Sequence, residues 1–442
     1  MYALDTQAIY MMDRVTADAR ALARMDRMLA GLGKTRDDVK VLSDEDLPEV
    51  IAEHEWQRAW VRQGLLAEHR PHYLVFNAVN FDERTERADR LREAAPEGTG
   101  LNLCRSLLGY VRTAVLAHVR QADQDRNCVC WSEHEFVTIE GCPHRCLYCG
   151  CGQLINVMLN LEEFADRVVG PTLAANEWQK CFRCNTTASD TICFEPEYGL
   201  HDLFTQVCAD FGDRYLYIHT KSANVDFIAD LPHRDRLIGV WSLSSQPVSE
   251  RIEPGAGTSR ERLEAARKCQ QMGVPVRFKF KPIIPVRGWR EQYAATIDGI
   301  FELTQPELVG FCVLMWMGFD SMVAALPEDD LDPQYLATAR AAAEEMKGSM
   351  LGPFPHEVRS EVYRFLIEQV RRHDRSAPLF ISTESREMWE ELGPVMGASA
   401  SRFLCGCGPC CVPGPRMAGA RTSTFVPQED EATAPSGEST GL

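Results

Sequence analysis

The sequence predicts an α/β protein whose main part is a complete or partial TIM-like barrel. From about residue 134, short apolar segments alternate with stretches of helical periodicity, and this alternation is typical of parallel βα units. About six or seven such units follow one another, and a barrel of this kind presents its active site at the C-terminal ends of its strands. Two further regions flank this part, a helical one before it and a cysteine-rich one after it.

The elements of the barrel can be placed from their periodicity and length. The expected strands cover residues 136–140, 181–186, 215–220, 237–242, 274–284, 308–315 and 379–382. The expected helices cover residues 161–168, 199–210, 259–272, 290–304 and 358–372.

Composition divides the chain into four regions. Residues 1–127 have the apolar spacing of helices, as at Leu47, Val50 and Ile51, and no competing strand pattern is visible there. The barrel is expected over 128–390 and a cysteine-rich extension over 391–412. Residues 413–442 are rich in Pro, Gly, Ser, Thr and Ala, so we expect a disordered tail.

The bulk composition is that of a soluble globular protein, with 45% hydrophobic and 25% charged residues. The net charge of −17 repels a phosphate backbone unless a local basic patch offsets it, so nucleic acid is not expected as a partner. We find neither a signal peptide nor an apolar run of about 18 residues. The expected location is therefore cytoplasmic, without membrane contact.

Cysteine is the most informative residue type, with 17 copies. In a reducing cytosol, clustered cysteines indicate metal or catalytic sites rather than disulfides. We expect the isolated ones to be small buried hydrophobic side chains, namely Cys104, Cys193, Cys208, Cys269 and Cys312.

The first cluster is Cys142, Cys146 and Cys149, with C-x3-C-x2-C spacing directly after the first expected barrel strand. Three thiolates can bind three irons of a [4Fe–4S] cluster and leave the fourth iron open to a small molecule. A zinc site completed by Cys151 or His144 is the alternative, since zinc usually takes four ligands. The spacing, the aromatic Tyr148 before the last cysteine, and the position after the first strand favour the iron–sulfur cluster.

These motifs resemble the radical S-adenosylmethionine (SAM) superfamily, and more narrowly its spore photoproduct lyase-like branch, over about residues 136–390. The other matching segments are individually weak but occur in the right order: 186–190 with Glu197, 220–222, 241–244, 253–255, 259–263, 282–285 and 382–389. The resemblance implies a partial (β/α) barrel, a [4Fe–4S] cluster, SAM as cofactor, and an electron donor such as flavodoxin or ferredoxin.

The same resemblance assigns the residues that contact SAM. Tyr148 would lie against its adenine, and Ser189, Lys221 and Ser242 would contact SAM, with Asp190 as a further candidate. Each of the last four sits at or just after an expected strand end, where a barrel presents its ligands. Taken singly, Lys221 is equally explained by a salt bridge with a carboxylate, and each serine by a backbone contact.

One departure from the family bears on the substrate. Photoproduct lyases carry a hydrogen-donor cysteine just before the serine that matches Ser189, whereas this chain has Thr187-Ala188 there, and Cys184 is displaced. We therefore expect a small anionic or thiophilic substrate. The alternatives are transfer of a 3-amino-3-carboxypropyl group from SAM to a soft acceptor such as trivalent arsenic, photoproduct lyase-like DNA repair, and a non-catalytic zinc protein.

A basic strand is the next candidate for the site. Arg277, Lys279 and Lys281 alternate with apolar residues, so they share one face of the strand. In a barrel covered by helices this face points into the lumen, where unpaired cations would be costly. Either acidic neighbours such as Glu195 or Glu197 pair with them, or they bind an anionic substrate or the SAM carboxylate.

The C-terminal cysteines Cys405, Cys407, Cys410 and Cys411 lie within seven residues. Three interpretations remain open. They hold a second iron–sulfur cluster with Cys181 and Cys184, they bind a soft substrate ion, or they form a structural zinc site. The soft-ion interpretation would resemble the terminal motifs of radical SAM enzymes of organoarsenical biosynthesis, and a redox-sensitive tail is the remaining alternative.

Overall fold

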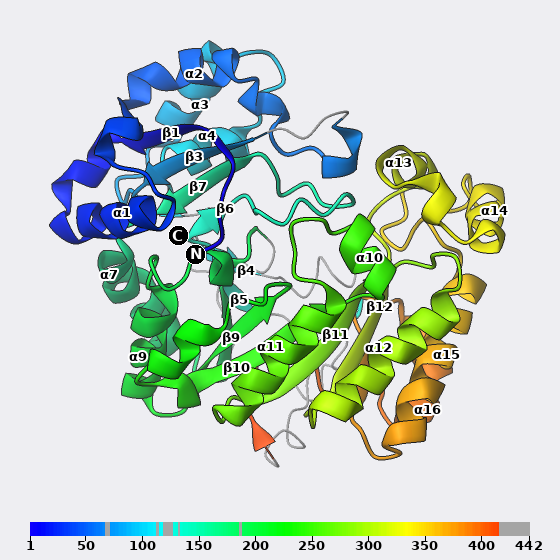
Figure 1. Ribbon diagram of the computed structural model, residues 1–442. Coiled ribbons are helices and arrows are strands. Elements are labelled where there is room, and N and C mark those ends of the chain that lie inside the picture. Colours follow the sequence, from blue (N-terminus) through cyan, green and yellow to red (C-terminus); the bar gives the residue numbers. More distant parts are fainter. Residues whose placement is uncertain (67–70, 112–114, 118–126, 131–132, 185–187, 415–442) are drawn as a thin grey trace.

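Two parallel sheets organise the protein (Figure 1). The computed structural model describes residues 1–66, 71–111, 115–117, 127–130, 133–184 and 188–414, and every statement below concerns these residues. The expected α/β class with parallel strands is confirmed. Most of the expected tail, residues 415–442, lies outside the described residues. None of the described helices is long and apolar enough to cross a membrane.

The smaller sheet has the order β2-β1-β3-β7-β6. Its strands are β1 (Thr6–Met12), β2 (Val39–Leu42), β3 (His72–Asn77), β6 (Ile139–Glu140) and β7 (Leu154–Met158). All neighbours are parallel except β6 and β7. The sheet therefore joins the N-terminal region to the segment that follows the first barrel strand.

Helices accompany this sheet as expected, but the strands were missed. The helices are α1 (Ala19–Gly31), α2 (Leu47–Glu53), α3 (Thr85–Ala94) and α4 (Leu101–Leu107). Strand β3 is buried along its whole length, and a short, continuously buried run cannot be distinguished from a helix by periodicity. The expectation that residues 1–127 contain no strand is therefore wrong.

The larger sheet has the order β13-β12-β11-β10-β9-β8-β5-β4 and does not close among the described residues. Its parallel strands are β5 (His134–Phe136), β8 (Cys181–Cys184), β9 (Tyr215–Thr220), β10 (Leu237–Leu243), β11 (Val276–Ile283), β12 (Val309–Val313) and β13 (Leu379–Ile381). Strand β4 (Val115–Ala117) pairs antiparallel with β5. The end of the strand expected over 181–186 lies outside the described residues.

The described helices of this part are α7 (Leu161–Phe164), α8 (Gly170–Ala175), α9 (Leu200–Phe211), α10 (Gln246–Arg251), α11 (Ser259–Gln271), α12 (Trp289–Leu303), α13 (Phe319–Ala325), α14 (Pro333–Ala341), α15 (His356–His373) and α16 (Arg386–Met396). The five expected helices, α7, α9, α11, α12 and α15, lie close to their expected ranges, and five further helices were not predicted. A π-helical turn, Ala165–Val169, continues α7. In Figure 1, α11 and α12 lie across one face of the strands β9 to β12.

The cysteine-rich segment crosses the N-terminal ends of the barrel strands. The backbone of Pro409 accepts hydrogen bonds from the amides of Lys180 and Cys181, where β8 begins. Further along, Gly408 O accepts from Tyr217 Oη at 2.5 Å, and Arg277 donates to Cys411 O at 2.7 Å. The segment therefore plugs the lower end of the barrel, opposite the edge where an active site is expected.

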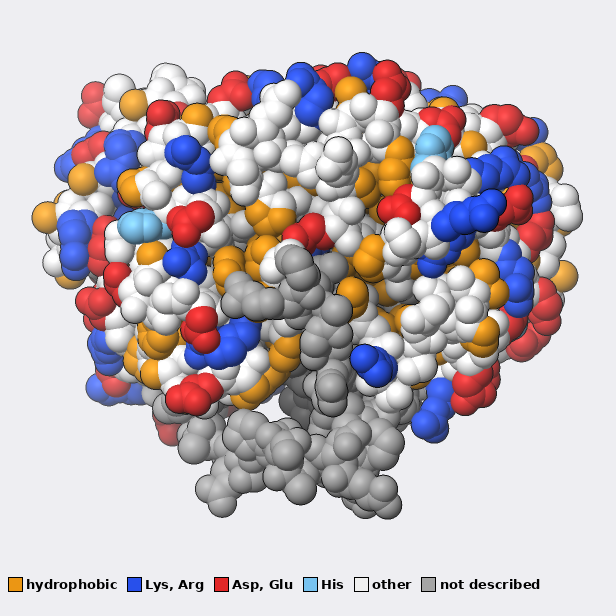
Figure 2. Space-filling model, turned by 90° about the horizontal axis from the view of Figure 1, so that it is seen from below, with side chains coloured by type: hydrophobic (Ala, Val, Ile, Leu, Met, Phe, Trp, Pro, Cys, Tyr) orange, Lys and Arg blue, Asp and Glu red, His pale blue; other side chains and the backbone are white. Residues whose placement is uncertain are grey.

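The view from below shows this end of the molecule (Figure 2). Acidic and basic side chains are interspersed around the rim, and hydrophobic side chains gather nearer the middle. Although the chain carries a net charge of −17, the described part of this face shows no single large acidic patch.

Candidate active site

The loop that carries the three predicted cluster cysteines is held by backbone contacts. It begins at Gly141, whose φ is +92° and whose missing Cβ would lie 1.9 Å from Leu154 O. Only glycine fits this combination of left-handed backbone and close approach. The amide of Gly141 donates to Ala188 O at 3.0 Å. The start of the motif is thereby tied to the end of the next barrel strand.

The same loop is held between the barrel and the N-terminal region. On the barrel side, Leu147 N donates to Ile252 O at 2.9 Å, and Gly255 N donates to His144 O at 2.9 Å. On the other side, Gln63 N donates to Cys149 O at 3.0 Å, and Gly64 N to Leu147 O at 2.9 Å. The N-terminal region therefore takes part in positioning the predicted metal ligands.

A pocket of about 130 Å³ lies over this loop at the C-terminal ends of the strands. All of the residues that the resemblance assigned to the cluster and to SAM line it, together with five neighbours from the loop and from β9. The lining is Cys142, His144, Arg145, Cys146, Tyr148, Cys149, Cys151, Ser189, Asp190, His219, Thr220, Lys221 and Ser242. Folding therefore gathers segments that are up to about a hundred residues apart in the chain into one site.

The carboxylate of Asp190 has hydrogen-bond partners from three other residues. It hydrogen-bonds to His144, with Nε2 to Oδ2 at 2.7 Å, and accepts from Thr220 Oγ1 at 2.7 Å and from the Lys221 amide at 2.9 Å. Although burial opposes ionisation, these hydrogen bonds lower the pKa of Asp190. This carboxylate therefore fixes the ends of two strands, and its remaining capacity for a ligand is small.

Lys221 points at the buried carboxylate of Glu253. Its Nζ lies 2.9 Å from Glu253 Oε1 and 3.0 Å from Lys281 O. Tyr148 Oη donates to the same Oε1 at 2.6 Å, and Arg262 donates to Oε2 at 2.6 Å. Burial opposes ionisation of Glu253, but Lys221 and Arg262 lower the pKa of its carboxyl. These contacts hold the Lys221 ammonium in one position beside the pocket.

Two buried polar atoms in the pocket have no hydrogen-bond partner within the described part of the chain, Ser189 Oγ and His219 Nδ1. The other ring nitrogen of His219 lies 3.2 Å from Ser242 Oγ. Burial and the nearby Lys279 lower the pKa of His219 to about 3, so its imidazole is neutral. Unpaired buried polar atoms are costly, and both belong to residues that line the pocket.

The spacing of the three thiols separates the two metal interpretations. Two sulfurs on one tetrahedral zinc ion lie about 3.8 Å apart, given Zn–S bonds of about 2.3 Å. The sulfurs of Cys142, Cys146 and Cys149 do not all lie within 4.8 Å of one another; among the described residues only His144, Asp190 and Cys193 form so tight a group. The three sulfurs are therefore not arranged as ligands of one tetrahedral zinc ion.

The three cations on the basic face of β11 have different neighbours, and the two glutamates named as examples of their partners are not among them. Arg277 pairs with Glu307 at 2.8 Å, and Lys279 Nζ lies 3.5 Å from Cys407 Sγ. Lys281 stands over the ring of Trp316, 4.4 Å from its centroid. Glu195 instead binds His201, and Glu197 binds the terminal ammonium of Met1, so neither reaches the strand.

Cys405, Cys407 and Cys411 are buried and Cys410 is half-buried, and the four sulfurs do not meet at one point. Cys405 and Cys407 have sulfurs 3.8 Å apart, whereas Cys410 Sγ contacts Trp178 O at 3.3 Å. Cys181 lies beside this segment, but Cys184 interacts with Glu135 and Cys208. The second-cluster interpretation that combined Cys181 and Cys184 with all four cysteines is not supported by this placement.

His219 lines the pocket but was not predicted as a site residue. Glu253 was not predicted as the ionic partner of Lys221. A signal for His219 was present, because it lies two residues before Lys221 at the end of a strand and therefore shares its face. Glu253 comes from a loop after β10, and no local pattern predicts its contact with Lys221.

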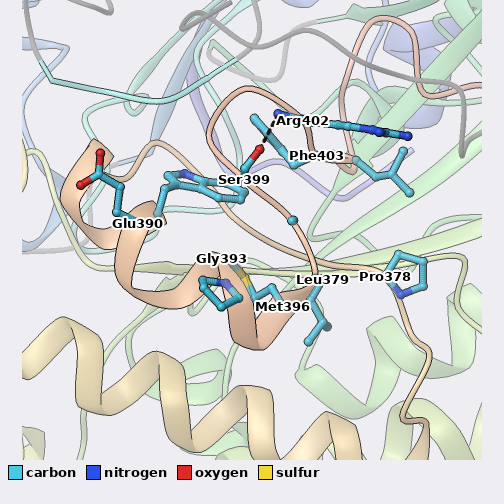
Figure 3. A pocket seen from close by; sticks show the side chains of 13 residues that line it. Pro378, Leu379, Glu390, Gly393, Met396, Ser399, Arg402 and Phe403 are labelled. Carbon is cyan, nitrogen blue, oxygen red and sulfur yellow. Dashed lines mark hydrogen bonds between the residues drawn. The ribbon is translucent and has the colours of Figure 1, made fainter.

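A larger hollow of about 620 Å³ lies elsewhere, between α16 and residues 397–404 (Figure 3). Its walls include Leu379, Met396 and Phe403, and the Arg402 amide donates to Ser399 Oγ at 3.2 Å. None of the predicted site residues lines it. Its volume exceeds that of the pocket above, but it lacks a comparable gathering of titratable groups.

Comparison with known proteins identifies similar chains. A family model described as spore photoproduct lyase matches residues 122–309. The spore photoproduct lyases of Bacillus subtilis (strain 168) and Geobacillus sp. (strain Y412MC61) are each 26% identical, over 174 and 176 residues, which is 37% of this chain and 49% of each relative. The matched part thus spans about half the length of these curated relatives.

Solved structures agree in fold. A spore photoproduct lyase complexed with dinucleoside spore photoproduct has a TM-score of 0.55 at 14% identity, over 86% of this chain and 99% of that one. A variant with bound AdoMet and dinucleoside spore photoproduct gives 0.53 at 13% identity, over the same shares. The expected resemblance to the spore photoproduct lyase-like branch of the radical SAM superfamily is therefore confirmed.

The expectation that nucleic acid is an unlikely partner is contradicted. The protein in the matched complex holds a dinucleoside, which is nucleic acid by its chemistry. Net charge was the wrong guide because a substrate responds to the local field of a pocket, and that field depends on the few charges that line it.

Proposed function

We propose that this chain is a radical SAM enzyme whose substrate is a nucleic-acid photoproduct of the dinucleoside spore photoproduct type. The observation that carries the proposal is the pocket that brings Cys142, Cys146 and Cys149 together with Ser189, Lys221 and Ser242. The three cysteines would hold a [4Fe–4S] cluster and the rest of the pocket would take SAM. The bound cluster would supply one electron, from a ferredoxin- or flavodoxin-type donor, for reductive cleavage of SAM.

The residues of this chain would position the cofactor and keep its surroundings dry. Ser189 Oγ and the neutral His219 imidazole offer unpartnered polar atoms to a ligand. Lys221, held by Glu253, offers an ammonium at a fixed place for a carboxylate. Tyr148, whose hydroxyl is anchored to the same glutamate, is positioned for the adenine contact that the family resemblance implies.

The substrate class is supported by a cation and an aromatic ring at the mouth of the barrel. Trp316 follows the end of β12, is 40% exposed, and has its carbonyl held by Arg62 at 2.7 Å. The Lys281 ammonium lies over its ring, and the Lys281 carbonyl accepts from Lys221 in the pocket. An exposed indole can stack on a base of such a dinucleoside, and the neighbouring cation holds the ring in place through a cation–π contact.

The first experiment tests cleavage of SAM. The protein is reconstituted with iron and sulfide without oxygen, given SAM and dithionite, and its nucleoside products are identified by mass spectrometry. We expect 5′-deoxyadenosine from the wild type and none from Cys146→Ala. Methylthioadenosine instead would favour transfer of the aminocarboxypropyl group, with arsenite as the next acceptor to test. A colourless protein without turnover would refute the radical enzyme and leave zinc binding.

The second experiment tests the substrate. Dinucleoside spore photoproduct is added to the active enzyme, and release of the two repaired nucleosides is followed by chromatography. Because Thr187-Ala188 stands where the family has its donor cysteine, slow turnover or by-products are informative only beside a spore photoproduct lyase assayed in parallel. If the compound neither binds nor reacts while 5′-deoxyadenosine still forms, the substrate assignment is wrong and the enzyme class stands.

A further inference from the structure

Two neighbouring strands of the larger sheet are followed by strained backbone at their C-terminal ends. Trp316, after β12, has a φ of +62°, and Thr383, after β13, has a φ of +58°. A left-handed φ is uncommon for a non-glycine residue, and for a β-branched one such as threonine it is a clear outlier. Residues held in this conformation cost free energy and cluster at functional sites, where the surrounding structure keeps them in place.

The strained conformation of Trp316 is held by two other segments of the chain. Its amide donates to Met350 O at 2.8 Å, and its carbonyl accepts from Arg62 of the N-terminal region at 2.7 Å. The Lys281 ammonium lies 4.4 Å from the centroid of its ring. Both backbone groups of Trp316 are therefore fixed, while its indole stays accessible to a ligand.

Thr383 is strained between two neighbours that are themselves fixed. The amide of Ser382 donates to Phe311 O at 2.8 Å, and the carboxylate of Glu384 accepts from Arg359 Nε at 2.9 Å. Ser382 and Glu384 are buried, whereas Thr383 is only half-buried. The left-handed turn therefore keeps a threonine side chain partly accessible at a place where the residues before and after it are held.

The hydroxyl of Thr383 is left with unused acceptor capacity. It donates its hydrogen to the carbonyl of Ser382, at 2.6 Å. Its other neighbours are sulfurs, Met315 Sδ at 3.5 Å and Cys312 Sγ at 3.6 Å, which are weak hydrogen-bond partners. Because a hydroxyl has one hydrogen and two lone pairs, it can accept a hydrogen bond from a ligand N–H without losing its own bond to the backbone.

Trp316 and Thr383 lie on the side of the barrel mouth that the pocket leaves free. The barrel residues that line the pocket come from the C-terminal ends of β9 and β10 and from the segment after β8. The sheet order places β11 between these strands and the pair β12 and β13, and parallel strands present their C-terminal ends at one edge. A ligand on Trp316 and Thr383 would therefore lie beside the pocket rather than in it.

Direct contacts connect the pocket with this side of the mouth. Lys221, which lines the pocket, donates to Lys281 O at 3.0 Å. The Lys281 ammonium lies over the Trp316 ring, and the sulfur of Met315, the residue before it, contacts the Thr383 hydroxyl. A substrate held here would thus be separated from the SAM pocket only by the end of β11.

We propose that Thr383 determines substrate specificity by accepting a hydrogen bond from the ring N–H of a pyrimidine base that stacks on Trp316. A pyrimidine that carries an N–H between two ring carbonyls offers the donor that this hydroxyl can accept. The indole offers a stacking surface that every base can use, so Trp316 contributes affinity and Thr383 selects among bases. The strain fixes the hydroxyl before the substrate arrives, so no further ordering cost is added on binding.

The inference rests on the proposed function, because it needs a substrate of the dinucleoside photoproduct type. Its test measures binding of dinucleoside spore photoproduct to the reconstituted full chain with SAM, without dithionite, by titration calorimetry. We expect Thr383→Val, which keeps the shape and loses the hydroxyl, to weaken binding about three- to tenfold, the contribution of a neutral hydrogen bond. Thr383→Ser, which keeps the hydroxyl, and Thr16→Val, an exposed change in the N-terminal region, should bind like the wild type.

A second ligand removes the donor instead of the acceptor. A photoproduct analogue whose ring N–H groups are methylated should bind wild type and Thr383→Val with the same affinity, because neither complex can form the proposed hydrogen bond. A purely structural role of Thr383 would instead weaken both ligands alike in Thr383→Val, and that result would refute the inference.

A glycine variant separates strain from recognition. Because glycine adopts left-handed backbone without strain, Thr383→Gly should melt at or above the temperature of the wild type and still bind the photoproduct at least as weakly as Thr383→Val. A lower melting temperature would mean that the conformation is not strained, and binding like that of the wild type would mean that the hydroxyl is not used.

The possible failures are distinguishable. If the wild type forms no 5′-deoxyadenosine with SAM and dithionite, the proposed enzyme class fails. If it cleaves SAM but does not bind the photoproduct, the proposed substrate fails and the role of Thr383 fails with it. If it does both, and Thr383→Val and Thr383→Gly bind the photoproduct as tightly as the wild type, only the inference about Thr383 is overturned.

Discussion

At the scale of single residues, Glu253 is the electrostatic centre of the site. It is fully buried and holds Lys221 and Arg262 through its two oxygens, with Tyr148 and Ser244 as further donors. Burying a carboxylate is costly unless cations and hydrogen bonds satisfy it, and breaking such a group leaves uncompensated charge inside the protein. Its contribution is therefore to position the lysine and the tyrosine as much as to stabilise the fold.

Replacing Glu253 by Gln should lower the free energy of unfolding by about 3–5 kcal/mol at neutral pH, because two buried cations lose their partner. The folded-state pKa of Glu253 is lowered, so its stabilisation is complete above the unfolded pKa of about 4.3 and is lost as the pH falls toward the folded value. Urea unfolding of wild type and variant should therefore converge on acidification. Glu250→Gln, an exposed change on α10, is the matched control.

Trp316 gives a prediction about substrate binding. Removing its exposed indole should weaken binding of dinucleoside spore photoproduct by about 1–3 kcal/mol, the contribution of one stacked base, and should leave SAM cleavage without substrate unchanged. Titration calorimetry of Trp316→Ala measures the loss, and Phe211→Ala, an exposed aromatic at the end of α9, is the control. Equal affinities of Trp316→Ala and wild type would remove this residue from the substrate site.

At the scale of elements, the cluster loop depends on close backbone contacts. A Cβ on Gly255 would lie 2.6 Å from Pro143 O and 2.7 Å from His144 O, so the segment after α10 fits against the loop only as glycine. Sub-van-der-Waals contacts with backbone cannot be relieved by a side-chain rotation, so the loop itself has to move.

We therefore expect Gly255→Ala to bind less iron after reconstitution while its helices and strands remain. A loss of about 1–3 kcal/mol is typical of an added methyl group in a packed site. Iron content and the visible absorbance of the cluster are measured beside circular dichroism. Gly100→Ala, where no atom lies within 4 Å of the added Cβ, should retain full iron, and a fully loaded Gly255→Ala would contradict the role given to this contact.

At the scale of the whole molecule, one face of the smaller sheet belongs to the same hydrophobic core as the larger sheet. Ile9, Leu74 and Ile155 on one face of the smaller sheet belong to the same cluster as the barrel interior, while Tyr10, Val75 and Leu154 on the other face pack in a second cluster with residues of α2 and α4. Alternate residues of each strand thus serve two cores. The N-terminal region is part of the folding unit that holds the cluster loop.

Substitution of Arg24 on α1 tests whether the N-terminal region and the larger sheet unfold together. Its guanidinium is nearly buried and donates to Tyr198 O at 2.8 Å and to Glu162 Oε1 at 2.8 Å, both of which belong to segments beyond the N-terminal region. Arg24→Ala should lower the free energy of unfolding by about 2–3 kcal/mol, as charged hydrogen bonds typically contribute. Arg20→Ala on the same helix, 63% exposed, should have little effect. A second unfolding transition in the wild type would contradict a single unit.

The barrel and the cluster loop were predictable because their signals are local. Tyr215–Thr220 was placed to the residue, since β-branched and aromatic residues between turn signals leave little choice. Ser189, Lys221 and Ser242 were placed at strand ends, and parallel strands bring their C-terminal ends to one edge. The buried strands β3 and β7 were not predictable, because their apolar runs have no period to separate strand from helix.

The sequence by itself determined the parallel α/β barrel, the three cysteines at its upper edge and the strand ends around them, because spacing and alternation are properties of neighbouring residues. Only the tertiary structure decided which charges meet, that Glu253 holds Lys221, that Lys279 faces Cys407 and that the C-terminal segment enters the barrel from below. Such pairs form between residues 32 and 128 positions apart, and the three-dimensional packing of the strands, rather than any local pattern, sets which of them come within reach.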